Sequence, residues 1–458
     1  MQLLIQKVVA RLSCLTVLTL KVLCLASVLS APTIAAEPFP DSVSGRLFQV
    51  QGSNTVGASL MKNFLTSYLE ARGASDVRVE DLPQANEYRV IGSVQGRDVF
   101  VDVGAHGSST GFRALLSGDA DLSMSSRPIK SKEVDQMAAY GDMLGFEAEH
   151  VIAIDGLAVI VNKDNPLTRL SLDQIAGVFS GQITNWKQLG AEDLAINVYA
   201  RDENSGTWDT FKSLVLRKIY RLSGSAQRFE SNDELSDRVA RDPGGIGFVG
   251  LASVRNSRAL LVFDQGTTPL LPEHVSVATE DYLLSRRLFL YTPPSLKTEV
   301  IEDFIRFVQS DAGQFQVEQT GFISQALTAI ASDAERNGPK DYLAVTEGAS
   351  RLSVNFRFAE GSSVLDNKAR QDIRRVQAFM ARAENQGRVL TLIGFGDEKQ
   401  SESRSLVLSK LRAVSVKTAL HRVGVNTRPV EGFGAFLPVA SNDGKEKVKN
   451  RRVEIWVR

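Results

Sequence analysis

Cysteine is almost absent from this chain of 458 residues, and both cysteines, Cys14 and Cys24, lie within the first 36 residues. The remainder of the chain therefore cannot form a disulfide or a cysteine-based metal site. The four histidines are scattered without the spacing of metal ligands, and neither a nucleotide-binding loop nor a Ser/His/Asp order is present. We therefore expect no metal, no cofactor and no enzyme activity.

Acidic residues are missing from residues 1–36, where three basic residues precede the apolar run 22–29 and small residues up to Ala36. This three-part pattern is typical of a secretory signal peptide that is cleaved after Ala35 or Ala36. The apolar run is shorter than the roughly 20 residues that a membrane span needs. We expect export to the periplasm, and this location argues against nucleic acid as a partner.

Net charge is also absent, but the balance conceals two parts of opposite sign. Residues 37–350 carry 29 basic and 42 acidic residues, whereas residues 351–458 carry 21 basic and 11 acidic residues. The small, polar residues 331–350 separate the two parts and are predicted to be a linker. A basic C-terminal module is compatible with nucleic acid, anionic lipid or an anionic polymer as its partner.

Within the acidic part, a strand is followed by a hydroxyl-rich turn and then a helix on three occasions, at turns 52–55, 107–111 and 201–207. A helix start presents unpaired N–H groups and a partial positive charge. The third turn adds the guanidinium of Arg201, so three converging turns would form a site for a small anion. Any one of these turns is equally compatible with an ordinary Ser/Thr helix cap.

The apolar run 151–161 is interrupted by a single acid, Asp155. Its length and its β-branched residues predict a buried strand that crosses between two lobes. A lone aspartate in such a strand costs free energy unless it is paired or functional.

The acidic part resembles the periplasmic phosphate-binding proteins of ABC importers over residues 46–330. The resemblance rests on motifs in the family's order: 52–55, 107–111, 125–128, 154–156, 179–181 with 184–186, 201–207 and 245–248. It implies an α/β fold, a two-lobed type II periplasmic binding protein, with a second lobe over about 151–255 and a ligand cleft between the lobes.

The resemblance also implies the ligand-binding residues. The positions that match the family's phosphate-binding residues are Asn54, Thr55, Ser108, Ser109, Arg201, Ser205, Gly206 and Thr207. Ser126 stands where some members have an aspartate that accepts the proton of hydrogen phosphate. Our hypothesis is that Asp155 replaces this acceptor. The motifs therefore favour a tetrahedral oxyanion more firmly than phosphate in particular.

The basic part, residues 351–458, alternates strand and helix patterns and resembles the OmpA-like peptidoglycan-binding domain, which is a small α/β fold. The matching residues are Asp397, 408–413 including Arg412, 432–434 and 450–454. The resemblance implies that Asp397 binds the ammonium and Arg412 the carboxylate of diaminopimelate in the wall peptide, with Arg451 or Arg452 assisting. A plain salt bridge is the alternative for Asp397 and Arg412. Gln400 and Ser405 depart from the family's usual glycine and asparagine.

These features together predict a periplasmic protein that captures phosphate or a similar oxyanion and is tethered noncovalently to peptidoglycan, near the wall or the outer membrane. A role in phosphate transport or sensing follows, with an ABC permease as a further candidate partner. The alternative is an envelope-attachment protein whose lobes recognise another oxyanion or a protein.

Overall fold

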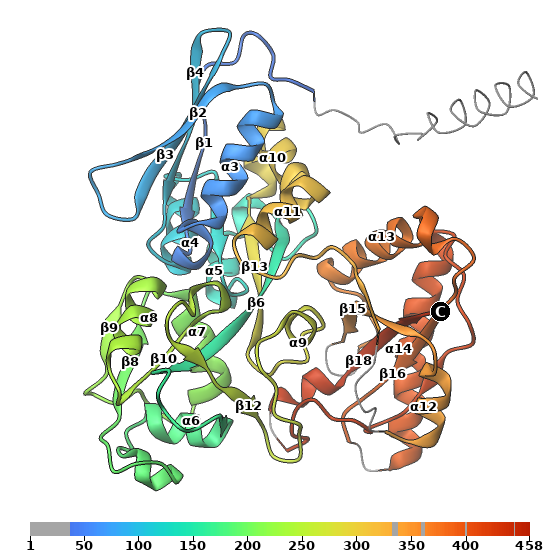
Figure 1. Ribbon diagram of the computed structural model, residues 1–458. Coiled ribbons are helices and arrows are strands. Elements are labelled where there is room, and N and C mark those ends of the chain that lie inside the picture. The colour runs from blue at the N-terminus through green and yellow to red at the C-terminus, as the bar shows by residue number, and fades with distance from the viewer. Residues whose placement is uncertain (1–36, 332–337, 359–361, 399–400, 444) are drawn as a thin grey trace, which may run out of the picture.

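The computed structural model describes residues 37–458 apart from 332–337, 359–361, 399–400 and 444. Figure 1 shows two lobes, one above the other, and a C-terminal domain beside them. The expected signal peptide, 1–36, lies outside the described residues. Within the described part, no helix is both long and apolar enough to cross a membrane.

The first lobe is built on a mixed sheet with the strand order β2-β3-β4-β1-β5-β13-β6. Its strands are β1 (Gly45–Gly52), β2 (Ser75–Asp81), β3 (Glu87–Val94), β4 (Arg97–Gly104), β5 (Leu122–Ser125), β6 (Glu149–Val161) and β13 (Ser285–Tyr291). Its helices are α2 (Asn54–Gly57), α3 (Leu60–Ala71), α4 (Ser108–Ser117), α5 (Ser131–Gln136), α10 (Glu299–Gln309) and α11 (Asp311–Gln319). Helices α3 and α10 bury their apolar stripes in one core, where Phe64 and Phe304 are fully buried.

Strand β6 passes from one lobe to the other, as the apolar run predicts. Its first half pairs with β13, and its second half, from Leu157 to Val161, pairs antiparallel with β10 (Gly245–Gly250). All of its residues from His150 onward are buried, which explains why the run lacks the polar alternation of a half-exposed strand. The two lobes therefore share one continuous strand.

The second lobe contains the strand order β6-β10-β8-β9. Its remaining elements are β8 (Asn197–Arg201), β9 (Gln227–Phe229), α6 (Leu172–Phe179), α7 (Gly206–Phe211) and α8 (Asn232–Arg241). Two further strands, β11 (Arg258–Ala259) and β12 (Leu261–Phe263), pair with β6 and with β7 (Arg169–Ser171). The second lobe thus reaches at least to Phe263, beyond the expected boundary near 255.

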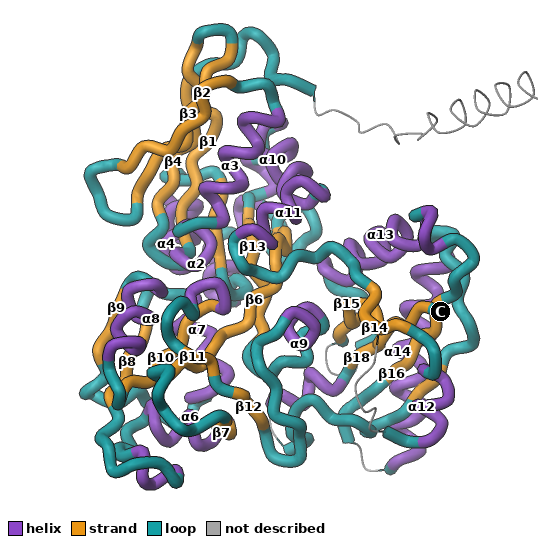
Figure 2. Tube along the Cα trace, in the orientation of Figure 1, coloured by secondary structure: helices purple, strands orange, loops and turns teal. Residues whose placement is uncertain are grey.

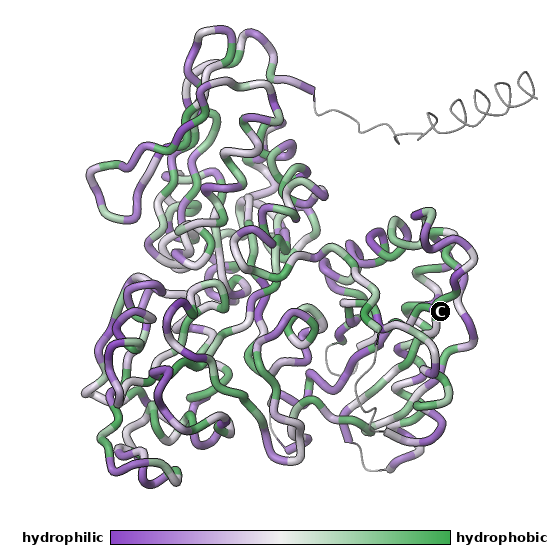
Figure 3. The backbone as a smooth tube through the Cα atoms, viewed as in Figure 1, coloured by the Kyte–Doolittle hydropathy of each residue, from purple (hydrophilic) through white to green (hydrophobic). Residues whose placement is uncertain are grey.

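The C-terminal domain is a five-stranded sheet in the order β14-β15-β18-β16-β17 with helices packed against it. Figure 2 shows these strands among α12, α13 and α14, and Figure 3 shows hydrophobic residues along them. The bounds are β14 (Ala329–Ala331), α12 (Lys340–Thr346), β15 (Ser350–Arg357), α13 (Asn367–Ala381), β16 (Leu390–Gly394), α14 (Glu402–Arg422), β17 (Glu431–Gly432) and β18 (Arg452–Val457).

Helix α12 corrects the expectation of a plain linker over 331–350. Its Tyr342 is buried, and its ring meets Phe395, Phe433 and Trp456 edge-on at centroid distances of 5.6–6.1 Å. This aromatic packing makes the helix part of the domain. Composition alone could not show it, because the apolar partners lie more than 50 residues further along the chain.

The C-terminal domain docks on the body through buried charges near α9 (His274–Ala278). Asp281 accepts hydrogen bonds from Arg351 and Arg357, each at 2.7 Å. Lys449 reaches Ser285 at 2.8 Å, and Arg287 of β13 reaches Asp366 at 2.6 Å. The domain is therefore seated against the strand that neighbours the crossing strand β6.

Candidate functional site

The three hydroxyl-rich turns meet where the lobes face each other. The Oγ1 of Thr55, in α2 of the first lobe, lies 3.0 Å from the Oγ1 of Thr207, in α7 of the second. Asn232 of α8 donates to the same Thr55 Oγ1 at 3.2 Å. Both threonines are buried, so these hydroxyls form a dry contact between the lobes.

Gly206 lies against two serines of the other lobe. A Cβ on this residue would stand 2.2 Å from Ser108 Oγ and 2.5 Å from Ser126 Oγ, so a side chain has no room there. Ser108 Oγ also accepts from the Ser126 N–H at 3.0 Å. The glycine thus allows the start of α7 to approach the start of α4, which explains the Ser-Gly-Thr order of the third turn.

Arg201 is the last residue of β8 and is only 1% exposed. Its Nε donates to the Phe229 carbonyl at 3.1 Å and its Nη2 donates to the Glu230 carbonyl, whereas its buried Nη1 has no partner among the described residues. The carboxylate of Asp202 lies 3.7 Å away, beyond a hydrogen bond. Burial lowers the pKa of Arg201 to about 10, so the guanidinium is still charged at neutral pH.

A second arginine, Arg286 of β13, lies in the site, although the sequence did not predict it as a site residue. Its Nε and Nη2 donate to Asp155 Oδ2 at 2.9 and 2.6 Å, and its Nη1 donates to Thr207 Oγ1 at 2.8 Å. The other carboxylate oxygen of Asp155 accepts from the Leu251 N–H at 2.9 Å. Burial raises the pKa of Asp155, and the adjacent guanidinium opposes that shift.

The partner of Asp155 could have been found from one signal in the sequence. A buried strand with a lone acid requires a cation, and Arg286-Arg287 stand immediately before the apolar run 288–291. Choosing between the two arginines requires the register of β13 against β6, which places Arg286 opposite Asp155. That Asp155 accepts a proton from the ligand stays a prediction. The structure adds that this carboxylate already accepts hydrogen bonds from Arg286.

Two other predicted residues, Ser205 and Ser109, have local side-chain partners. Ser205 caps α7, and its Oγ accepts from the N–H groups of Thr207 at 3.2 Å and Trp208 at 3.4 Å. Ser109 Oγ accepts from Arg127 Nη2 at 3.1 Å. Asn54 is buried at the start of α2. The capping role expected as the alternative for the third turn is thus real, and it leaves the hydroxyl proton of Ser205 available to a ligand.

Polar side-chain contacts bridge the lobes at the rim of this site. Arg127 Nε lies 2.9 Å and Lys130 Nζ 2.5 Å from Asp209 Oδ2. On the other side, His106 Nδ1 lies 3.1 Å from Glu230 Oε1. These pairs join residues of the first lobe to residues of the second, so the structure shows the lobes closed upon each other.

The C-terminal domain brings together three of its four predicted residues. Asp397 Oδ2 accepts from Arg451 Nη2 at 2.9 Å, and Arg412 Nη1 donates to the Phe395 carbonyl at 3.4 Å. Burial lowers the pKa of Arg412, while Asp397 acts in the opposite direction. A cavity of about 380 Å³ adjoins this group and is lined by Glu398, Glu402, Ser405, Ala435, Phe436 and Asn442.

Arg452, the fourth predicted residue, does not face Asp397. It donates to Glu454 Oε1 at 2.9 Å, lies 4.1 Å from the centre of the Phe395 ring and approaches Asp281 of the body at 3.8 Å. Arg451 and Arg452 thus point to different partners, Asp397 and Asp281. This is expected because successive side chains of a strand point to opposite faces of the sheet. Arg452 therefore belongs to the interface with the body.

Comparison with known proteins identifies the families to which the two parts of the chain are similar. Residues 55–312 match the model of a PBP superfamily domain, and residues 357–452 match the OmpA family. The chain is 30% identical over 227 residues to the phosphate-binding protein PstS of Borreliella burgdorferi, an alignment that covers 48% of this chain and 77% of that protein. It is also 30% identical over 254 residues to the protein SphX of Synechococcus elongatus, which covers 53% and 74%.

Among solved structures, a putative phosphate ABC transporter substrate-binding protein from Clostridium perfringens, with bound phosphate, is 26% identical. The alignment covers 61% of this chain and 99% of that chain, with a TM-score of 0.49.

The lobes and their shared strand define a two-lobed binding protein. The chain belongs to the PBP superfamily and, within it, to the family of the phosphate-binding proteins PstS, and it continues into a C-terminal OmpA family domain.

Proposed function

We propose that the chain captures phosphate, or a similar tetrahedral oxyanion, between its lobes without catalysing a reaction. The observation that carries this proposal is Arg201, a buried guanidinium whose Nη1 has no partner among the described residues and whose nearest described carboxylate, that of Asp202, lies 3.7 Å away. Burying a charge without a close counter-ion is costly, and an anion beside Arg201 would remove that cost. The name of the Borreliella burgdorferi relative, phosphate-binding protein PstS, supports phosphate as the ion.

The surrounding groups suit an oxyanion because they are donors from both lobes. Hydroxyls of Thr55 and Ser108 come from the first lobe, and Thr207 and the start of α7 come from the second. Hydrogen bonds to charged groups contribute about 1.5–3 kcal/mol each in net terms. The summed contribution of several such hydrogen bonds exceeds the roughly 8 kcal/mol of binding free energy in a micromolar complex. The excess offsets the free-energy cost of ordering the two lobes around the ion.

For the C-terminal domain, we propose noncovalent attachment to peptidoglycan. The match to the OmpA family and the grouping of Asp397, Arg412 and Arg451 support it. A zwitterion such as diaminopimelate needs an anion and a cation at its two ends, and Asp397 and Arg412 supply one of each. Attached in this way in the periplasm, the protein would hold phosphate near the wall for an ABC permease or for sensing.

Titration calorimetry of residues 37–458 with phosphate, and separately with sulfate, tests the first proposal. We expect one phosphate per chain with micromolar or tighter affinity and much weaker binding of sulfate. Equal affinity for phosphate and sulfate would show that the protein binds oxyanions without specificity for phosphate. The absence of heat with either ion would refute the proposal and favour the alternative, an envelope-attachment protein whose lobes recognise a protein.

A further inference from the structure

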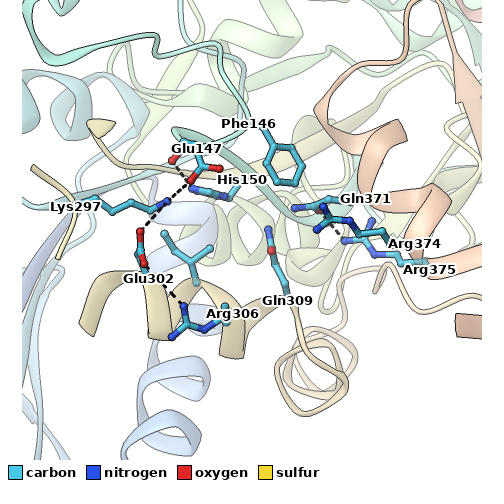
Figure 4. A pocket seen from close by; sticks show the side chains of 11 residues that line it. Phe146, Glu147, His150, Lys297, Glu302, Arg306, Gln309, Gln371, Arg374 and Arg375 are labelled. Atoms are coloured by element: carbon cyan, nitrogen blue, oxygen red, sulfur yellow. Dashed lines mark hydrogen bonds and ion pairs between the residues drawn. The ribbon is translucent and has the colours of Figure 1, made fainter. Parts of the chain in front are cut away.

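A cavity of about 360 Å³ lies where the C-terminal domain meets the first lobe. Figure 4 shows its walls: Lys297, Glu302, Arg306 and Gln309 on the body's side, Gln371, Arg374 and Arg375 of α13 facing them, and Phe146, Glu147 and His150 above. Neither domain alone encloses it. The cavity is separate from the interlobe cleft and from the group around Asp397.

The cations of this cavity are compensated with one exception. Lys297 Nζ lies 3.0 Å from Glu147 and 3.7 Å from Glu302, and Arg375 is 2.7 Å from Asp372. Arg374 makes no ion pair with any residue in the described part of the chain, and its guanidinium lies 5.6 Å from the centre of the Phe146 ring. Its charge is therefore available to a ligand at the junction.

Two further residues, Gln309 and His150, line the same cavity. Gln309, at the end of α10, has a buried Nε2 that meets no hydrogen-bond acceptor in the described structure. His150 is 5% exposed, and burial lowers its pKa to about 4, so it adds no charge at neutral pH. A guanidinium fork and an amide donor together match a carboxylate, which accepts two parallel hydrogen bonds from arginine.

The volume of the cavity and the carboxylates on its body side indicate the size and the chemistry of the ligand. A volume of this size is within the range of sites for drug-sized organic ligands, and is larger than a single inorganic ion needs. Glu147 and Glu302 line the cavity and are both paired with Lys297, and each carboxylate has further lone pairs that can accept from an ammonium or amide N–H. We propose that the interdomain cavity binds a short peptide by its free terminal carboxylate, with Arg374 and Gln309 as the carboxylate-binding residues.

A bound peptide would contact both domains and so hold them together. The test uses residues 37–458 and the tripeptide Ala-Ala-Ala, with a free carboxylate or as its C-terminal amide, followed by calorimetry. We expect the free acid to bind at least tenfold more tightly than the amide. Arg374→Gln should remove this preference, whereas Arg370→Gln, which deletes an equal charge elsewhere on α13, should preserve it.

Equal affinity for the acid and the amide, or an acid preference that survives Arg374→Gln, would overturn the proposal. So would inorganic phosphate occupying this site in place of peptide, seen as a second phosphate per chain that disappears in Arg374→Gln. A folding defect in Arg374→Gln is recognised by its thermal unfolding, and Gln309→Leu then provides an independent variant: the proposal requires weaker binding of the acid there.

Discussion

The interlobe cleft and the interface between the body and the C-terminal domain both bury arginines, but they compensate them differently. At the interface, Arg351 has the carboxylate of Asp281 at 2.7 Å, and the nearby carboxylates raise its pKa against the effect of burial. In the cleft, the hydrogen bonds of Arg201 to described residues go to carbonyls, the carboxylate of Asp202 lies 3.7 Å away, and burial lowers the pKa of Arg201 to about 10.

Unpaired N–H groups alone do not separate the two regions, because Arg351 and Arg357 also have one each. A hydrogen-bonded carboxylate is what distinguishes the interface arginines from Arg201. Arg286 in the cleft also has such a carboxylate, Asp155 at 2.6 Å, whereas Arg201 has the carboxylate of Asp202 at 3.7 Å. Arg201 is therefore the cleft arginine that is prepared for an anion from solution.

The largest expected effect comes from removing the counter-ion at the interface. In Asp281→Asn, the guanidiniums of Arg351 and Arg357 lose their shared carboxylate, which should lower the free energy of unfolding by about 3–5 kcal/mol. Urea unfolding of residues 37–458 measures this. The control, Asp233→Asn, disrupts an exposed pair with Arg255 and should change stability by about 1 kcal/mol or less. Similar losses in both variants would contradict the distinction.

Arg201→Gln should have the next largest effect, on ligand affinity. The glutamine keeps a donor but loses the charge, so phosphate affinity should fall about 100-fold, equivalent to about 3 kcal/mol. Because the buried charge is costly without an anion, the ligand-free variant should be no less stable than the wild type. Calorimetry and unfolding of the same samples check both statements, with Arg255→Gln on the second lobe's surface as the control. Destabilisation without loss of affinity would make Arg201 a structural residue.

Arg412→Ala should reduce retention on purified sacculi roughly tenfold, since one charged hydrogen-bond partner of the wall peptide is removed. Lys410→Ala is the matched control on the same helix, because Lys410 is exposed and Arg412 is buried. Retention is measured by co-sedimentation and immunoblotting. Equal retention of both variants would show that the Asp397 group is a plain salt bridge.

The smallest expected effect is that of Asp155→Asn on selectivity. Loss of this charge removes the partner of Arg286 and the candidate acceptor of a phosphate proton, so the ratio of phosphate to sulfate affinity should fall about fivefold. Competition calorimetry determines the ratio, with Asp242→Asn, remote from the cleft, as the control. An unchanged ratio would assign Asp155 solely to positioning Arg286.

Sequence patterns anticipated much of this architecture. The crossing strand β6 lies where the apolar run 151–161 predicts a buried strand. The run is informative because this strand is buried on both faces, so nearly all of its residues are apolar. The hairpin of β2 and β3 went unpredicted, since β2 is mostly exposed and the two valines on one of its faces are too few to indicate a strand.

The site was harder to predict than the fold wherever it depends on register. Arg201 and the three turns are visible because each is a local motif. Arg286 is 131 residues away from Asp155, and only the pairing of β13 with β6 decides that it, and not Arg287, faces this acid. The split between Arg451 and Arg452 has the same origin. Local chemistry identifies the candidates, and tertiary pairing selects among them.

The two neighbouring arginines of β13 also bear on how the chain can be truncated to isolate its phosphate-binding part. Arg286 serves the cleft, and Arg287 serves Asp366 of the C-terminal domain. A shortened protein that ends near residue 331 would expose Asp281 and Arg287 to water and would carry β14 without its partner β15. Such a fragment therefore has a newly exposed charged surface beside strand β13, and we expect its affinities to differ from those of the intact chain.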